Sequence, residues 1–220
     1  MSDIIIIGGG IAGISAAAQI APHAKVTVLE REDELAYHAS GRSAAAFIED
    51  YGNAVVRELN SASVDYLTNA NGGVLSKRGM MLLAKKEERE DFQSEAKSFG
   101  LNEISKSEAK EKIPLISTKI VSYSAYRKDV SDIDTDLLFQ NFLKEAQSFG
   151  TLVHTKAEVN SISFEKNRWN LITTKGEYSC EILINATGAW ADHTARMAGI
   201  ETLKFTPYRR SIARSPVPGG

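Results

Sequence analysis

A short apolar strand that runs into a glycine-rich turn is the feature that most constrains what this chain can fold into. Ile4 to Ile7 are four consecutive isoleucines with no polar alternation, which predicts a strand buried on both faces of a parallel sheet. Gly8 to Gly13 follow at once and fit the pattern G-x-G-x-x-G, and the apolar residues after them recur at helical spacing. A second apolar strand, Val26 to Leu29, ends in Glu30. This order predicts a βαβ unit of the dinucleotide-binding kind.

Each glycine of this pattern has a physical role in such a unit. Gly8 permits the tight turn from strand to helix, Gly10 lets a pyrophosphate approach the backbone, and Gly13 lets the helix pack close to the strand. Glu30 lies at the tip of the second strand, where a carboxylate accepts hydrogen bonds from ribose hydroxyls and repels a 2′-phosphate. The alternative is a glycine-rich turn in an ordinary βαβ unit, and the motif alone does not separate FAD from NAD.

The composition excludes several classes of protein. The 220 residues include 43% hydrophobic and 25% charged residues, with a formal net charge of −2; these values fit a globular protein and predict no nucleic-acid partner. No apolar run reaches the length of a membrane span and no basic leader precedes the first strand, so we expect neither a span nor a signal peptide. The single cysteine, Cys180, favours a cytoplasmic location and an inert buried thiol. The four histidines lack the spacing of metal ligands, so no metal site is predicted.

The small residues from Ser40 to Phe47 have two interpretations. Serine, glycine and alanine let backbone approach a flat ligand closely, and Ser40 or Ser43 could cap a short helix whose N–H groups meet a phosphate or a ring oxygen. The alternative is a capped, alanine-rich helix that packs on the sheet. The spacing alone does not decide between them.

An acidic run, Asp132 to Asp136, opens a predicted helix that ends at Gly150. The residues of this helix that we expect to face inward are Leu137, Leu138, Phe142 and Ala146. Its acids could be read as a calcium loop, but the run lacks the glycine and terminal glutamate of an EF-hand. We prefer helix capping, because acids complement the positive end of a helix.

The order of the remaining elements predicts an α/β fold with a discontinuous, Rossmann-like dinucleotide-binding domain and part of an inserted α+β domain. We expect helices at residues 53–69, 85–99, 107–112 and 189–198, and strands at 78–84, 120–127, 151–154, 157–164, 168–174, 177–184 and 203–213. The predicted dinucleotide domain comprises residues 1–75 and 132–200. The partial substrate domain comprises residues 76–131 and 201–220.

Several motifs together resemble one family, the flavin-dependent amino-acid oxidoreductases that include D-amino-acid oxidase, glycine oxidase and sarcosine oxidase. Within that group the chain is most similar to the bacterial D-arginine dehydrogenases. The resemblance spans nearly all 220 residues, and its motifs are the glycine pattern with Glu30-Arg31, Tyr37-His38 leading into Gly41-Arg42-Ser43-Ala44-Ala45, Tyr51-Gly52, Asp132 to Asp136, Asn185 to Trp190, and Arg209-Arg210-Ser211. It implies FAD as the cofactor.

The resemblance also implies a role for each matching residue. The cofactor-binding residues it implies are Gly8, Gly10, Gly13, Glu30, Arg31, Ser40, Arg42, Ser43, Ala44, Ala45, Val159, Ala186, Thr187, Gly188 and Trp190. Arg31 would lie beside the adenine, and Val159 would meet it through backbone. Tyr51 would line the substrate pocket, and one arginine of Arg209-Arg210, for which we favour Arg210, would pair with a substrate carboxylate through a bidentate fork.

The implied chemistry is oxidation of the Cα–N bond of an amino acid by hydride transfer to the flavin. Two positions depart from the arginine-specific relatives, where a histidine follows the Ser-Ala-Ala run and an acid near residues 78–84 meets the substrate guanidinium. Here Ala46 and Gly79 stand there. Without that carboxylate a cationic side chain loses its partner, so we expect a smaller or apolar amino acid as the substrate.

Full-length relatives of this family are much longer than 220 residues. Three alternatives follow from that difference: an amino-acid dehydrogenase or oxidase that is catalytic when complete, a truncated module that holds FAD weakly or not at all, or one subunit of a split flavoenzyme. In the last case a second polypeptide would supply the missing C-terminal half.

Overall fold

Two compact units make up the chain in a computed structural model that describes residues 2–43, 45–209 and 211. Unit 1 consists of Met1–Arg42 and Phe142–Gly220, and unit 2 is Ser43–Asn141. Unit 1 is therefore discontinuous in sequence. The predicted domain boundaries, with residues 1–75 and 132–200 holding the dinucleotide, differ from these units; they assign residues by ligand and stay a prediction.

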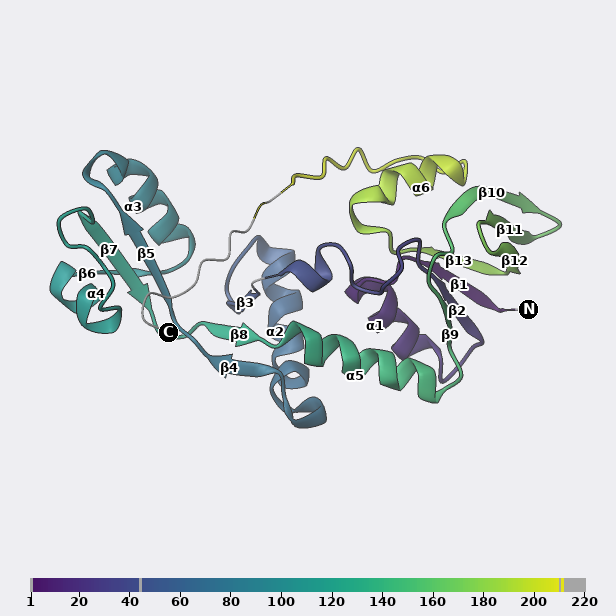
Figure 1. Cartoon of the computed structure of the whole chain (residues 1–220), viewed down its shortest axis with the longest axis horizontal. Helices are drawn as coiled ribbons and strands as arrows, with labels where there is room; N and C mark the ends of the chain where they lie inside the picture. The colour runs from purple at the N-terminus through teal and green to yellow at the C-terminus, as the bar shows by residue number, and fades with distance from the viewer. Residues whose placement is uncertain (1, 44, 210, 212–220) are drawn as a thin grey trace. The chain divides into compact units, whose positions relative to one another are not determined.

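The centre of unit 1 is a four-stranded parallel sheet in the order β13-β1-β2-β9. Its strands are β1 (Ile4–Ile7), β2 (Val26–Leu29), β9 (Leu152–His154) and β13 (Ile182–Asn185). Every residue of β1 and β2 is buried, as the unbroken apolar runs predict. Parallel pairing of β1 with both β2 and β13 confirms the predicted α/β class and brings residues 4–7 beside residues 182–185 (Figure 1).

The two faces of this sheet are covered by different structures. Helix α1 (Ile11–Ile20) lies on the face that carries Ile6, because a Cβ on Gly13 would touch both Ile6 and the carbonyl oxygen of Gly8. The other face packs against the antiparallel meander β10-β11-β12. Its strands are β10 (Val159–Glu165), β11 (Arg168–Thr173) and β12 (Gly176–Cys180).

The core between sheet and meander contains Ile5, Ile7, Leu29, Leu171 and Cys180, each at most 7% exposed. Cys180 is a free, buried thiol, and burial raises its pKa, which agrees with the inert thiol that the sequence predicts.

Two of the strands predicted for unit 1 differ from the structure. The run 177–184 is divided: β12 ends at Cys180 and belongs to the meander, whereas β13 begins at Ile182 and belongs to the parallel sheet. The charged residue Glu181 stands between the two strands, and the prediction treated it as part of one strand. The strand expected over 203–213 is absent from its described part. Residues 201–209 form neither helix nor strand, and the Asp192 carboxylate accepts the backbone N–H groups of Leu203 and Phe205, at 3.1 and 2.9 Å.

Unit 2 contains two three-stranded antiparallel sheets, β3-β8-β4 and β5-β7-β6. The first sheet consists of β3 (Ala46–Phe47), β8 (Ser131–Ile133) and β4 (Leu75–Lys77), and the second of β5 (Met80–Ala84), β7 (Tyr123–Arg127) and β6 (Asn102–Ile104). The α-helices that begin in unit 2 are α2 (Ala54–Asn69), α3 (Arg89–Ser98), α4 (Lys106–Lys112) and α5 (Thr135–Ser148). The buried Phe92 and Ala96 of α3 pack on Ala84 and Ala125 of the second sheet.

The strand predicted over 78–84 is present as β5 but begins at Met80, because Arg78 and Gly79 form the turn that connects it with β4 of the other sheet. Gly79 has φ +77° and a Cβ there would meet the Tyr126 ring, and the N–H groups of Arg78 and Gly79 both point at the Val130 carbonyl oxygen. Glycine permits this left-handed conformation without strain. The turn between β4 and β5 thus falls at Arg78 and Gly79, directly before the apolar run of β5.

The predicted helices at 53–69 and after Asp132 are present, but their apolar faces differ from expectation. None of the residues of α2 is buried, and Leu59 is 63% exposed. Helix α5 carries the chain from unit 2 into unit 1, and the Asp134 carboxylate accepts the Leu137 N–H at 2.9 Å. This confirms capping as the role of that acid. Leu137, predicted to face inward, is 41% exposed, whereas Ala146 is fully buried as expected.

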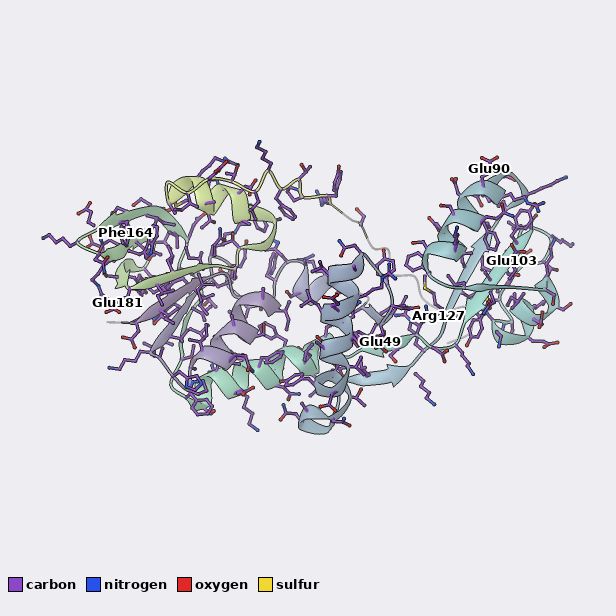
Figure 2. The ribbon with its side chains drawn as sticks, turned by 180° about the vertical axis from the view of Figure 1, so that it is seen from behind. Glu49, Glu90, Glu103, Arg127, Phe164 and Glu181 are labelled. Atoms are coloured by element: carbon purple, nitrogen blue, oxygen red, sulfur yellow. The ribbon has the colours of Figure 1, made fainter. Side chains whose placement is uncertain are left out.

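An ion pair in unit 2 fixes the turn that carries Tyr51. Arg127, labelled in Figure 2, lies on β7. Its guanidinium contacts Asp50 at 2.8 Å and donates to the Phe99 carbonyl oxygen at 3.1 Å. The rings of Tyr51 and Phe99 stack with centroids 4.9 Å apart and planes 8° apart. A hydrogen bond and the charge of Arg127 hold the pKa of Asp50 below its ordinary value.

We predict that Leu171→Ala destabilises unit 1 by about 2–5 kcal/mol, the usual effect of truncating a fully buried leucine. Leu171 is 1% exposed in the core between sheet and meander. The matched control is Ile172→Ala, because this neighbour is 52% exposed on the same strand; we expect a loss below about 1 kcal/mol. Urea unfolding measures the free energy of unfolding of both variants. Equal decreases in the two variants would contradict this account of the core.

We also predict that the stabilising effect of Asp50 depends on pH. Because the folded-state pKa of Asp50 is lowered, the ion pair stabilises the fold above the ordinary carboxyl pKa and loses its effect as pH falls through the folded value. Asp50→Asn should therefore lower Tm at pH 7, and the gap to the unaltered chain should narrow as pH falls below about 4. Thermal unfolding at a series of pH values measures this gap; a gap that widens in acid would contradict it.

Candidate dinucleotide site

The glycine loop of unit 1 lies where β1 ends, between the ends of β2 and β13. Gly8 donates its N–H to the Leu29 carbonyl oxygen at 2.8 Å, and the N–H of Ala186 reaches the Ile7 carbonyl oxygen at 2.9 Å. Gly8 has φ +112°, and a Cβ there would collide with the carbonyl oxygen of Ala186. The loop therefore needs glycine both for its conformation and for its close contact with the segment after β13.

Glu30 ties the end of β2 to this loop. One carboxylate oxygen, Oε2, accepts the Gly9 N–H at 2.7 Å, and the other, Oε1, accepts the Glu32 N–H at 2.9 Å. Two backbone donors hold the carboxylate, and each oxygen keeps further lone pairs for hydroxyl donors. The predicted ribose-binding acid is thus fixed beside the glycine loop.

Ser40 occupies the N-terminus of α1. Its Oγ accepts the Ile11 N–H at 2.9 Å, and it lies 3.2 Å from where a Cβ on Gly10 would stand. Because the hydroxyl accepts from the helix, its own hydrogen can donate outward to an anion. Free N–H groups and the positive end of α1 complete a place suited to a phosphate. These features fit the pyrophosphate of a dinucleotide.

The described residues of 40–47 form no alanine-rich helix. Ser40–Arg42 is a single 3-10 turn, η1, and Ala46–Phe47 is the strand β3. Ser40 caps α1, a helix far from it in sequence, and caps no helix of its own. The alternative of close backbone approach agrees with this geometry.

The segment after β13 forms a second braced junction. It consists of the 3-10 turn η4 (Gly188–Trp190) and helix α6 (Ala191–Met197). Asn185 donates its side-chain N–H to the Ala191 carbonyl oxygen at 2.8 Å, and its Oδ1 accepts the Thr187 hydroxyl at 2.8 Å. Ala186, Thr187 and Gly188 are thereby held against the glycine loop.

A cluster of side chains connects the two junctions. The Arg31 guanidinium lies 4.0 Å above the Trp190 ring centroid, and the His38 ring lies 4.7 Å from the same ring. Glu32 accepts from Arg31 Nε at 2.9 Å and contacts His38 Nε2 at 2.8 Å. The hydrogen bond from His38, followed by the effects of Arg31, lowers the pKa of Glu32. We call Arg31, Glu32, His38 and Trp190 the Arg31 cluster.

Arg42 extends this wall of the site. Its Nε donates to the Tyr37 carbonyl oxygen at 2.7 Å, and its guanidinium lies 4.7 Å from the Tyr37 ring centroid. The Tyr37 and His38 rings meet edge to face at 5.0 Å. The three aromatic rings of Tyr37, His38 and Trp190 therefore connect the guanidinium of Arg42 with that of Arg31.

Most of the predicted cofactor residues come together in unit 1. The residues that meet around the glycine loop are Gly8, Gly10, Gly13, Glu30, Arg31, Ser40, Arg42, Ala186, Thr187, Gly188 and Trp190. Val159 opens β10, two residues after Ala157, whose N–H donates to the Glu30 carbonyl oxygen at 2.8 Å. Its backbone therefore starts beside the acid that the sequence predicts for the ribose.

The other predicted residues do not belong to this group. Ser43, Ala45 and Tyr51 lie in unit 2. Ala44 and Arg210 lie outside the described residues. Sequence reasoning missed Glu32 and His38. The only signal for them was the closeness of Glu32 to Glu30-Arg31 and of His38 to the Tyr37 to Ala45 motif.

A hollow of about 550 Å³ lies elsewhere in unit 1, beside Ser2, Thr27, His154 and Tyr178. Its lining includes no residue of the glycine loop, so it is separate from the dinucleotide site. Among the described residues no group of three or more His, Cys, Asp or Glu side chains could hold a metal ion. No helix in the described ranges combines the length and apolar character needed to cross a membrane.

Comparison with curated proteins places the chain among flavoenzymes. The family model "FAD dependent oxidoreductase" matches residues 3–220. L-2-hydroxyglutarate dehydrogenase of Escherichia coli K12 is 29% identical over 240 residues, which cover 97% of this chain and 54% of that protein. The same enzyme of Indibacter alkaliphilus is 24% identical over 94% of this chain and 56% of its own length. The chain spans about half the length of these relatives.

Solved structures show the same fold. FAD-bound L-α-glycerophosphate oxidase from Mycoplasma pneumoniae superposes with a TM-score of 0.75 at 21% identity, covering 90% of this chain and 57% of that one. Glycine oxidase from Geobacillus kaustophilus gives 0.74 at 23% identity, covering 91% and 59%. These likenesses confirm the FAD-binding α/β fold.

The family match extends from the first strand through all described segments of the site. It confirms FAD as the cofactor, a choice that the glycine pattern alone left open. Since the match covers residues 3–220, the chain belongs to the FAD dependent oxidoreductase family.

Proposed function

We propose that this chain is the FAD-binding part of an oxidoreductase that removes hydride from the α-carbon of a small amino acid. The observation that carries the proposal is the glycine loop, with Glu30 fixed on the Gly9 N–H and Ser40 on the Ile11 N–H. Together with the family match, this arrangement supplies a place for the ribose and pyrophosphate of FAD. When bound, the flavin supplies the hydride acceptor.

The chain's own residues provide binding and orientation. Gly8, Gly10 and Gly13 with the N-terminus of α1 would hold the pyrophosphate, and Glu30 would hold the adenosine ribose. Ser43, Ala44 and Ala45 would follow the flavin and its phosphates, as the resemblance implies. The aromatic ring of Tyr51 stacks on Phe99, which restricts its orientation for a role in lining a substrate pocket.

A 2-hydroxy acid is a second candidate substrate. Curated relatives of this chain include L-2-hydroxyglutarate dehydrogenases, and a glycine oxidase shares the fold. An amino acid and a 2-hydroxy acid share a carboxylate beside an oxidisable carbon. Both candidate substrates differ from D-arginine. A cationic side chain would find no carboxylate at Gly79, where the D-arginine dehydrogenases have an acid nearby.

In this proposal Arg210 binds the carboxylate of the substrate. The cytoplasmic location of the protein is a separate prediction from the sequence. A guanidinium holds a carboxylate by two parallel hydrogen bonds, which lysine cannot reproduce. Tyr51 and Arg210 are thus the proposed substrate-binding residues, and a second polypeptide remains the proposed source of any part of the active site that this chain lacks.

We predict that Gly10→Ala weakens FAD binding at least about tenfold while the fold persists. Gly10 has φ −82°, which alanine adopts without strain, and among the described residues its new methyl would meet the Ser40 hydroxyl alone, at 3.2 Å. The methyl would stand where the pyrophosphate approaches the backbone. FAD titration followed by the flavin absorption band measures the dissociation constant.

The matched control for this variant is Ser15→Ala, a change on α1 at an exposed hydroxyl that donates to the Ala12 carbonyl oxygen. We expect this control to bind FAD as the unaltered chain does. Equal binding by Gly10→Ala would contradict the pyrophosphate assignment, and an unaltered chain that retains no FAD would overturn the proposed function.

We further predict that an α-amino or 2-hydroxy acid bleaches the flavin band of the FAD-loaded protein under anaerobic conditions. Arg210→Lys should raise KM at least about tenfold, whereas Arg209→Lys should leave KM within about twofold. Bleaching by amino acids alone supports the first candidate, and bleaching by 2-hydroxy acids alone supports the second. A protein that binds FAD but is bleached by neither would favour a cofactor-binding module or a subunit that needs a partner.

A further inference from the structure

We propose that the Arg31 cluster determines nucleotide selectivity: Glu32, Trp190 and His38 keep the Arg31 guanidinium from binding an adenosine 2′-phosphate. The inference rests on the proposed function, because it concerns the adenosine end of the same site. Glu32 and Trp190 are positioning residues in this account, since they act through Arg31.

Arg31 directly follows the acid that the site offers to the adenosine ribose. A carboxylate at the tip of the second strand accepts ribose hydroxyls, whereas an arginine nearby accommodates a 2′-phosphate. Glu30 and Arg31 are therefore two neighbouring groups with opposite preferences. Which preference prevails depends on whether the guanidinium of Arg31 is available to an incoming phosphate.

Two side chains, Glu32 and Trp190, already contact this guanidinium and so compete with a 2′-phosphate for it. Its Nε donates to Glu32 at 2.9 Å, and its Cζ lies over the Trp190 ring, 4.0 Å from the ring centroid. His38 contacts the same Glu32 oxygen at 2.8 Å, so the carboxylate is itself held in place. A guanidinium paired with a carboxylate on its edge and stacked on an indole face has fewer donors left for a phosphate.

The backbone fixes both partners of Arg31. The Glu32 N–H is bound by the Glu30 carboxylate at 2.9 Å, and the Glu32 carbonyl oxygen accepts the Lys156 N–H at 2.9 Å. Trp190 lies in η4, which Asn185 braces through the Ala191 carbonyl oxygen at 2.8 Å. The two segments that hold Arg31 thus come from β2 and β13, on either side of the strand that leads into the glycine loop.

The charges of the loop support the same conclusion. Glu30 and Glu32 flank Arg31, so the loop carries a net negative charge that disfavours a phosphate dianion. The cluster remains partly open to water: the side chains of Arg31 and Glu32 are 36% and 27% exposed. Removing the charge of Glu32 would therefore weaken its contact with Arg31 without opening a buried core.

The test compares binding of 5′-ADP with that of 2′,5′-ADP, two probes that differ in one phosphate. In the full chain, we expect the unaltered protein to prefer 5′-ADP. Glu32→Gln should reduce this preference about tenfold, since a freed guanidinium forms a charge-assisted hydrogen bond to the 2′-phosphate. Trp190→Leu should reduce it as well, and Trp190→Phe should restore it because the aromatic face returns. Fluorescence or calorimetric titration gives both dissociation constants.

The matched control is Asp33→Asn, which removes one negative charge from the same loop. Asp33 contacts Lys156 at 3.2 Å, and its side chain is 76% exposed, so we expect the preference to change less than about twofold. A ratio of dissociation constants is unaffected by a general loss of folded protein. The inference would be overturned if Glu32→Gln and Asp33→Asn changed the ratio of the two dissociation constants equally, or if neither variant changed it.

The two proposals fail in different ways. An unaltered chain that binds 2′,5′-ADP as tightly as 5′-ADP, yet retains FAD, overturns this selectivity alone. An unaltered chain that binds neither nucleotide nor FAD overturns the proposed function, and the inference with it.

Discussion

Burial of β1 between two parallel partners is the constraint on which unit 1 depends. Its four isoleucines pair with Val26–Leu29 on one side and with Ile182–Asn185 on the other. Parallel strands end at one edge of a sheet, so the residues after each strand must meet there. The glycine loop, Glu30 and the 186–190 segment are neighbours for this reason, although more than 150 residues of chain separate the first from the last.

The parts of the fold that were predictable from sequence are those where local pattern and long-range pairing agree. The runs Ile4–Ile7 and Val26–Leu29 form the strands expected, with the same limits. Prediction was wrong over 177–184, where neighbouring residues belong to two different sheets. Glu181 separates β12 from β13, and one charged residue between apolar ones does not by itself show that the chain changes sheet.

The same contrast applies to the site. Gly8, Gly10, Gly13 and Glu30 were recognisable because their roles depend on spacing along one βαβ unit. The contact of Arg31 with Trp190 was not recognisable, because it depends on which strands flank β1. Ser40 illustrates the difference: its type suggested a cap, but only the fold shows that the capped helix is α1.

Both junctions at the carboxyl edge are braced by a side chain at a strand end. Glu30 accepts N–H groups from Gly9 and Glu32, and Asn185 accepts from Thr187 while donating to Ala191. Loops fixed in this way lose little further entropy when a ligand binds, so more of the contact energy contributes to affinity. The same bracing determines which donors remain free. Because Glu32 and Trp190 already engage Arg31, the junction that holds the ribose-binding acid also limits the charge it presents to a phosphate.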